Sequence, residues 1–176
     1  MDHGRRTPAA VRATRHFADL PVTRADIEAI VDAARWTGSA RNRQPWRFVS
    51  VTGHALRQRL ATLGQYALPI ATAPAALVLL SDSSAGRDTE FDLGRVCQSL
   101  VLAAHAAGLG SCPVSLYPEA NAVAAARMAG YDLPWLANHA IALGHPAPAP
   151  AGRSAILSGR KPVSELLTHI GEHGPR

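Results

Sequence analysis

The chain has 176 residues, 47% of them hydrophobic, which favours a single domain (1–176) with a packed core. No apolar run approaches the ~18 residues of a membrane-spanning helix, and the N-terminus lacks the apolar core of a signal peptide, so we expect a soluble cytoplasmic protein without a membrane partner. The net charge of +5 is compatible with nucleic-acid binding, but no helix-turn-helix, zinc-finger or RRM signature accompanies it, and a small anionic ligand explains a local Arg cluster equally well.

The first basic cluster lies in "VRATRHF", residues 11–17. Arg12 and Arg15 are three residues apart, so on a helix they would share a face and could hold a phosphate together. Arg pairs at this spacing are also common on solvated surfaces, where they bind nothing. The pattern alone favours the solvated face.

The following segment predicts a helix, a polar loop and a strand. "TRADIEAIVDAARWT" opens with Thr23 and has Asp26 three residues later, which is close to a capping box, and Gly38 is expected to end the helix. The loop "SARNRQPW", 39–46, is unusually polar for a segment that enters the core as a strand over 46–51. Buried polar groups need partners, and a ligand is one source of them.

The middle of the chain predicts its core. A helix carries Leu56, Leu60 and Leu63, and the continuous apolar run 75–81 is typical of a strand buried on both faces. The longest predicted helix, 89–107, is apolar nearly all round and rich in small residues. We therefore expect it to be buried at the centre of the protein or at an interface, with Gly108 as its C-cap.

The last third alternates extended and helical segments. We expect residues 111–117 to be extended, a helix to start at Pro118, a strand over 138–144, an extended Pro-rich arm from 145 and a short helix within 162–173. Strands and helices mix without a strict βαβ rhythm, which favours an α+β fold.

Few motifs carry chemistry of their own. "GLGS", 108–111, follows a helix and lacks the third Gly of a dinucleotide fingerprint, so it indicates a helix end whose tight turn could also admit a flat ligand. "SGRKP", 158–162, adds Arg160 and Lys161 far from the first cluster. The two cysteines form no CxxC pair and the eight histidines show no spacing typical of metal ligands, so no metal site is expected. The sequence also shows no Ser/His/Asp set and no carboxylate pair. The polar residues look like binding residues, and a cofactor would supply any chemistry.

Taken in order, several segments resemble the FMN-dependent nitroreductase family over nearly the whole chain. They are "RATRHF", "PVTRADI", "SARNRQPWRFVSV", "TAPAALVLL", "DLGRVCQSLVLAAHAAGLGSCPV", "IALGHP" and "GRKPVSEL". The resemblance implies an α+β fold with a mainly antiparallel sheet flanked by helices, in an intertwined homodimer whose arm of about 145–160 wraps the partner. Only "SDSSAGRDTE" joins the buried strand to the long helix, so the chain resembles a short form without an inserted lid.

The resemblance also implies a flavin site. Arg12, Ala13 and Arg15 match the first FMN-binding segment, and Arg15 is expected to stabilise the reduced flavin. Three further groups match other parts of the site. The loop residues Ser39, Asn42 and Gln44 are expected to reach a flavin held mainly by the other subunit. The strand residues Val114, Ser115 and Leu116 are expected to place their backbone near flavin N5 and O4. Gln65 is expected near the ring, and Arg160 near the phosphate. No protein residue is expected to be catalytic, because flavin N5 carries the chemistry.

The implied reaction passes hydride from NADH or NADPH through FMN to a nitroaromatic, a quinone or a similar flat oxidant in a ping-pong cycle. Ala13 stands where the family usually has Ser, Gly38 precedes Ser39 where Pro is usual, and no cation lies at Ser158, which leaves open whether FMN binds more weakly than usual. Several further functions are compatible with the sequence. They are an FMN-sequestering protein with little turnover, a dehydrogenase, a dehalogenase and a flavin-cleaving enzyme of the same family, and, less in keeping with the motifs, a nucleic-acid binder.

Overall fold

A computed structural model describes residues 10–149, 159–171 and 174–175. Its centre is a four-stranded sheet in the order β1-β2-β4-β3, and every neighbouring pair is antiparallel. The strands are β1 (Trp46–Val51), β2 (Ala75–Asp82), β3 (Gly110–Ser115) and β4 (Trp135–Gly144). This arrangement confirms the predicted α+β fold with a mainly antiparallel sheet.

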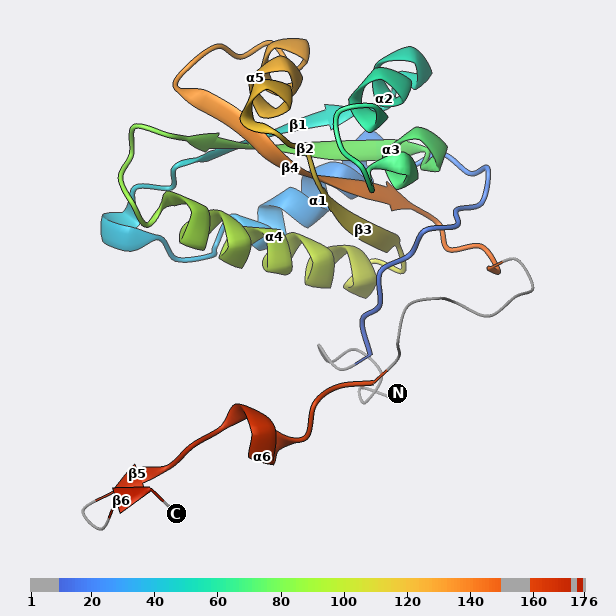
Figure 1. Ribbon diagram of the computed structural model, residues 1–176. Helices are drawn as coiled ribbons and strands as arrows, with labels where there is room; N and C mark the ends of the chain where they lie inside the picture. The colour runs from blue at the N-terminus through green and yellow to red at the C-terminus, as the bar shows by residue number, and fades with distance from the viewer. Residues whose placement is uncertain (1–9, 150–158, 172–173, 176) are drawn as a thin grey trace.

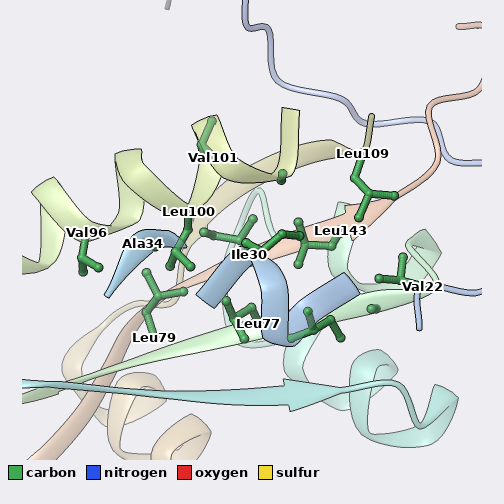
Figure 2. Packing of buried hydrophobic residues seen from close by; sticks show 14 of the residues in the cluster. Val22, Ile30, Ala34, Leu77, Leu79, Val96, Leu100, Val101, Leu109 and Leu143 are labelled. Atoms are coloured by element: carbon green, nitrogen blue, oxygen red, sulfur yellow. The ribbon is translucent and has the colours of Figure 1, made fainter. Parts of the chain in front are cut away.

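Helices cover both faces of the sheet (Figure 1). Two lie on one face, α1 (Arg24–Ala34) and α4 (Thr89–Ala106), and three on the other, α2 (His54–Ala61), α3 (Leu68–Thr72) and α5 (Glu119–Met128). Side chains of β2 alternate between two apolar clusters: Leu77 and Leu79 pack toward α1 and α4, whereas Val78 and Leu80 pack toward the opposite helices. The strand is therefore buried on both faces, as its apolar run predicts. Figure 2 shows the first cluster, in which Ile30 of α1 and Leu100 of α4 meet the sheet.

Two local predictions are confirmed by the backbone. Thr23 caps α1 in a complete capping box, with its hydroxyl accepting from the Asp26 amide and the Asp26 carboxylate accepting from the Thr23 amide. Gly108 follows the end of α4 with φ +79°, a left-handed conformation that suits glycine.

The long helix α4 is buried on one side only. Leu93, Val96 and Leu100 face the sheet, but Phe91 is 71% exposed and nothing lies within 4 Å of a Cβ placed on Gly94. The prediction of a helix buried nearly all round is therefore wrong for the single chain. Its outer face is open.

Residues 11–17 form no helix, so Arg12 and Arg15 share no helical face. The segment is extended and makes single β-bridges, from Ala13 to Ser111 and from Phe17 to Pro146. Contacts far away in the sequence, which local spacing cannot reveal, decide its conformation.

Other boundaries differ from the sequence prediction. α1 ends at Ala34, before Gly38, because the Thr37 amide and hydroxyl both donate to the Ala34 carbonyl. β4 begins at Trp135, three residues early, because its first residues pair with the end of β2 beyond a register shift. The short α3 and a 3-10 turn at Ala40–Asn42 were not predicted.

The C-terminal segment lies away from the sheet (Figure 1). It contains α6 (Val163–Leu166), the predicted short helix, and two-residue strands β5 (Ile170–Gly171) and β6 (Gly174–Pro175). Residues 150–158, most of the predicted arm and including Ser158, lie outside the described residues. In the described part of the chain, no helix has the length and apolarity needed to cross a lipid bilayer.

Candidate functional site

A groove of about 580 Å³, here called the β3 groove, runs along the edge strand β3. It is lined by Arg15, Tyr66, Cys97, Cys112, Pro113, Val114, Ser115, Tyr117 and His139. Three predicted site residues, Arg15, Val114 and Ser115, thus meet in one cavity.

The backbone of β3 decides which groups face the groove. β3 pairs with β4 on one side only, so alternate residues turn their N–H and C=O groups outward. The Ser111 carbonyl points outward, because it accepts from the Thr14 amide at 2.8 Å, whereas the Leu116 amide points inward to the Asn138 carbonyl at 2.8 Å. By this alternation Pro113, which has no N–H, occupies an outward position where no ladder bond is lost. The Ser115 amide lies on the same open edge.

The predicted residue Leu116 therefore differs from its neighbours. Its amide donates to the Asn138 carbonyl, and the residue is only 1% exposed. Ser115 presents its backbone to the groove, and Leu116 packs in the core.

Close backbone contact holds the N-terminal segment against β3. A Cβ on Gly110 would lie 2.6 Å from Thr14 Oγ1, so glycine lets residues 13–15 approach the strand. Arg15 consequently reaches the groove beside Cys112, where burial raises the pKa of the thiol and the Arg15 charge acts in the opposite direction. Arg12 lines an adjacent hollow of about 300 Å³ with Gly110. The predicted first segment and the predicted strand lie side by side.

Gln65 reaches the rim of the β3 groove through one contact. Its Oε1 accepts from the hydroxyl of Tyr117 at 2.8 Å, and Tyr117 lines the groove. Gln65 thus contacts a residue of the groove lining without being part of that lining itself.

A row of three polar side chains that the sequence did not reveal ends at the same groove. Ser115 Oγ lies 3.4 Å from His139 Nδ1, and His139 Nε2 lies 3.9 Å from Glu90 Oε2. Glu90 also accepts from the hydroxyl of Ser81 at 2.7 Å and from the amide of Asn138 at 3.4 Å. The three residues lie on β3, β4 and α4, and Ser115 and His139 are cross-strand partners. The register of β3 against β4 and the packing of α4 bring them together, and the sequence reveals neither.

The polar loop 37–43 is held along α4 by four contacts, here called the α4 clamp. Its helix-side residues are Asp88, Asp92, Arg95 and Ser99, which recur at the three- and four-residue spacing of one helix face. Asp92 is 1% exposed and accepts from the Ala40 amide at 2.8 Å, while an Arg95 guanidinium N–H donates to the Gly38 carbonyl at 2.7 Å.

The loop itself adopts a costly conformation. Arg41, Asn42 and Gln44 have left-handed φ angles of 53°, 53° and 48°, which non-glycine residues rarely adopt. Ser39 Oγ accepts from the Gln44 amide at 2.8 Å, and the Gln44 side chain donates to Asn42 Oδ1 at 3.0 Å. The loop thus satisfies part of its polar groups internally, and the clamp holds Thr37, Gly38, Ala40 and Arg43.

Not every predicted site residue joins the β3 groove. Ser39, Asn42 and Gln44 do not line it within one chain, and Arg160 is exposed and donates to the carbonyl of its neighbour Gly159. Among the residues that the structure describes, no group of three or more His, Cys, Asp or Glu side chains could hold a metal ion.

Known proteins resemble this chain in sequence and in fold. A Methanothermobacter thermautotrophicus protein named "Putative NADH dehydrogenase/NAD(P)H nitroreductase" is 30% identical over 147 residues, covering 81% of this chain and 76% of that protein. The "Oxygen-insensitive NADPH nitroreductase" of Salmonella typhimurium is 46% identical over 52 residues, covering 30% of this chain and 22% of that protein. The crystal structure of "a putative nitroreductase in complex with fmn" from Desulfovibrio desulfuricans has a TM-score of 0.74 at 27% identity, covering 89% of this chain and 90% of that one. The model of the Nitroreductase family matches residues 9–68 and 64–145, well over half of the sequence. The chain therefore belongs to the nitroreductase family.

Proposed function

We propose that the protein is an FMN-dependent oxidoreductase that uses NADH or NADPH to reduce a nitroaromatic, a quinone or a similar flat oxidant. The observation that carries this proposal is the β3 groove, which joins an open strand edge to the guanidinium of Arg15. The names of the M. thermautotrophicus and S. typhimurium relatives support the choice of co-substrate.

The residues of the groove fit a flat, partly charged ring. Its volume of about 580 Å³ lies within the usual range for cofactor sites, and Val114 and Cys97 supply apolar walls. The outward Ser115 amide offers a hydrogen-bond donor at the ring edge, and Tyr117 with Gln65 offers polar groups at the rim. Among the described residues, no carboxylate side chain lines the groove. An anionic cofactor would therefore meet a cation and no opposing charge in this lining.

Each predicted residue has a role in this proposal. Arg15 would stabilise negative charge at the N1–C2=O edge of the ring, because a cation placed where charge develops lowers the energy of the charged state. Arg12 and Arg160 would bind the phosphate, and the bridged backbone of Ala13 would line the same side. When bound, FMN would accept hydride from NAD(P)H and deliver electrons to the oxidant.

The loop residues Ser39, Asn42 and Gln44 imply a second chain. They do not line the groove of their own chain, and the outer face of α4 beside them is open. We therefore infer a homodimer in which each loop reaches the groove of the partner, and a cytoplasmic location, where NADH and NADPH are available.

A flavin titration tests the proposal. The purified chain should bind FMN with a perturbed visible spectrum, bleach on anaerobic addition of NADH or NADPH, and regain its colour on addition of menadione. FMN binding without bleaching would favour a flavin-sequestering protein instead. A chain that binds no FMN would refute both functions.

A further inference from the structure

The Ser115–His139–Glu90 row ends where the proposed flavin ring would lie. Ser115 and His139 both line the β3 groove, and Ser115 carries the outward amide of the strand edge. His139 Nδ1 is 3.4 Å from Ser115 Oγ, which is within reach of a hydrogen bond once the side chains adjust. Glu90 faces the other ring nitrogen from α4 at 3.9 Å and is itself held by Ser81 and Asn138. The imidazole is thus oriented from both sides.

His139 also has access to solvent. Its side chain is 43% exposed and that of Glu90 is 52% exposed, so protons can reach the row from water. The other titratable or charged groups that line the groove are Arg15, Tyr66, Cys97, Cys112 and Tyr117. Arginine stays charged, and burial raises the pKa of Cys97 to about 11, so that its thiol holds its proton near neutral pH. Histidine is the side chain that ordinarily exchanges a proton between pH 5 and 8.

We propose that His139 donates a proton to the oxidant during its reduction, with the hydroxyl of Ser115 as relay and Glu90 as the residue that positions the ring. This inference rests on the proposed FMN function. Reduction of a quinone to a hydroquinone requires two electrons and two protons. With FMN bound and reduced, two electrons and one proton would come from the flavin, and protonated His139 would supply the second proton to the other quinone oxygen through Ser115. The neutral imidazole then takes a proton from solvent.

The test compares an oxidant that consumes protons with one that does not. Reoxidation of the reduced FMN-loaded protein by menadione should slow by on the order of a hundredfold in His139→Gln, because a positioned proton donor contributes about that much. Reoxidation by ferricyanide, which takes up electrons without protons, should change by less than about threefold. His54→Gln, an exposed histidine on α2, is the matched control and should leave both rates unchanged. Equal losses with both oxidants would show a structural role and overturn the proposal, as would unchanged menadione rates.

A second measurement needs no turnover. In protein with ¹⁵N-labelled histidine, loading with FMN should move the His139 ring signals, while the His54 signals should stay unaffected. Glu90→Gln should lower the rate of reoxidation by menadione less than His139→Gln does, because it leaves the imidazole in place. If FMN binds and NAD(P)H bleaches it, but FMN leaves the His139 signals unchanged and His139→Gln leaves the menadione rate unchanged, this inference fails while the proposed function stands. If no FMN binds, the proposed function fails with it.

Discussion

Single residues decide which chemistry the open edge of β3 can offer. Gly110 has no side chain to block the N-terminal segment. Pro113 lies at an outward-facing position of β3, where its missing N–H removes no hydrogen bond of the sheet, and the amide of Ser115 also faces outward. Arg15 then lies in the β3 groove, and Arg12 lies in the hollow next to it. The two guanidiniums, three residues apart, therefore serve different cavities, which allows one to face a ring and the other a phosphate.

These two locations predict which Arg substitutions weaken FMN binding more than riboflavin binding. Arg12→Ala and Arg160→Ala should each weaken FMN binding about tenfold to a hundredfold, since a charge-assisted contact is worth roughly 1.5–3 kcal/mol. The loss should shrink for riboflavin, which has no phosphate, whereas Arg15→Ala should weaken both ligands alike. Fluorescence titrations of the three variants with both flavins would measure these ratios. Equal losses for FMN and riboflavin in Arg160→Ala would contradict its assignment to the phosphate.

The thiol of Cys97 predicts a second residue-level effect. Burial raises its pKa from 9.0 to about 11, so at pH 8 its thiolate is roughly a hundredfold scarcer than that of an ordinary cysteine. Because the folded pKa lies above the unfolded one, the associated stability is fully present below pH 9 and is lost as the pH rises through about 11.

Labelling with iodoacetamide in a Cys112→Ser background would report Cys97 alone. The native chain should react about a hundredfold more slowly than the urea-unfolded chain at pH 8, and FMN should protect the thiol further because it lines the groove. Equal rates in the folded and unfolded chains would contradict the burial argument.

At the scale of elements, the α4 clamp holds a loop in a conformation that it would not adopt alone. Asp92 is its most buried member, and its carboxylate accepts from Ala40 while facing Arg95 at 3.4 Å. Asp92→Ala should lower the free energy of unfolding by about 1.5–3 kcal/mol, because it leaves the part-buried amide N–H of Ala40 and the guanidinium of Arg95 without this acceptor. Asp32→Ala is the control, since its ion pair with Arg35 is exposed on both sides and should be worth less than about 0.5 kcal/mol. Urea titrations would compare the two, and similar small losses would show that the clamp contributes little.

The sequence predicts elements well where local pattern decides them. The apolar run of β2, the capping box of Thr23 and Asp26, and the left-handed Gly108 all follow from residues close together in the chain. The extended form of residues 11–17 does not, because their partner Ser111 lies about a hundred residues away. The strain of the loop also escapes prediction, since Arg41 and Gln44 have no propensity for positive φ and a tertiary clamp imposes it.

The sequence likewise predicts only part of the candidate site. Arg15, Val114 and Ser115 are assigned through the family resemblance, and the structure brings them together in one groove. His139 and Glu90 could not be found from the sequence, because their proximity depends on the register of β3 against β4 and on the packing of α4. Interactions within one segment are legible in a sequence, and those between segments are not.

At the scale of the molecule, the single chain leaves the outer face of α4 uncovered beside its polar loop. The outer side of α4 exposes Phe91 next to Gly94, and a hollow of about 670 Å³ lies between this face and Thr37 at the start of the clamped loop. In the proposed homodimer, a second copy would cover this face, and its loop residues Ser39 and Asn42 would reach the first chain's groove. A site shared in this way would link dimerisation to FMN binding, each favouring the other.

This linkage gives the last prediction. Phe91→Glu replaces an exposed apolar ring on the open face of α4 by a carboxylate, so it should convert dimer to monomer and weaken FMN binding together, because covering a charge removes it from water at a cost and the monomer lacks the partner's loop. Leu133→Glu is the control: it replaces a similarly exposed apolar residue in the turn before β4, outside both α4 and the loop 37–43, and should change neither property. Sedimentation velocity with detection at the flavin absorbance, across a dilution series of each variant, would follow mass and bound FMN at once. A monomer that retains full FMN affinity would refute the shared site, since the loop 39–44 would then have no part in holding the cofactor.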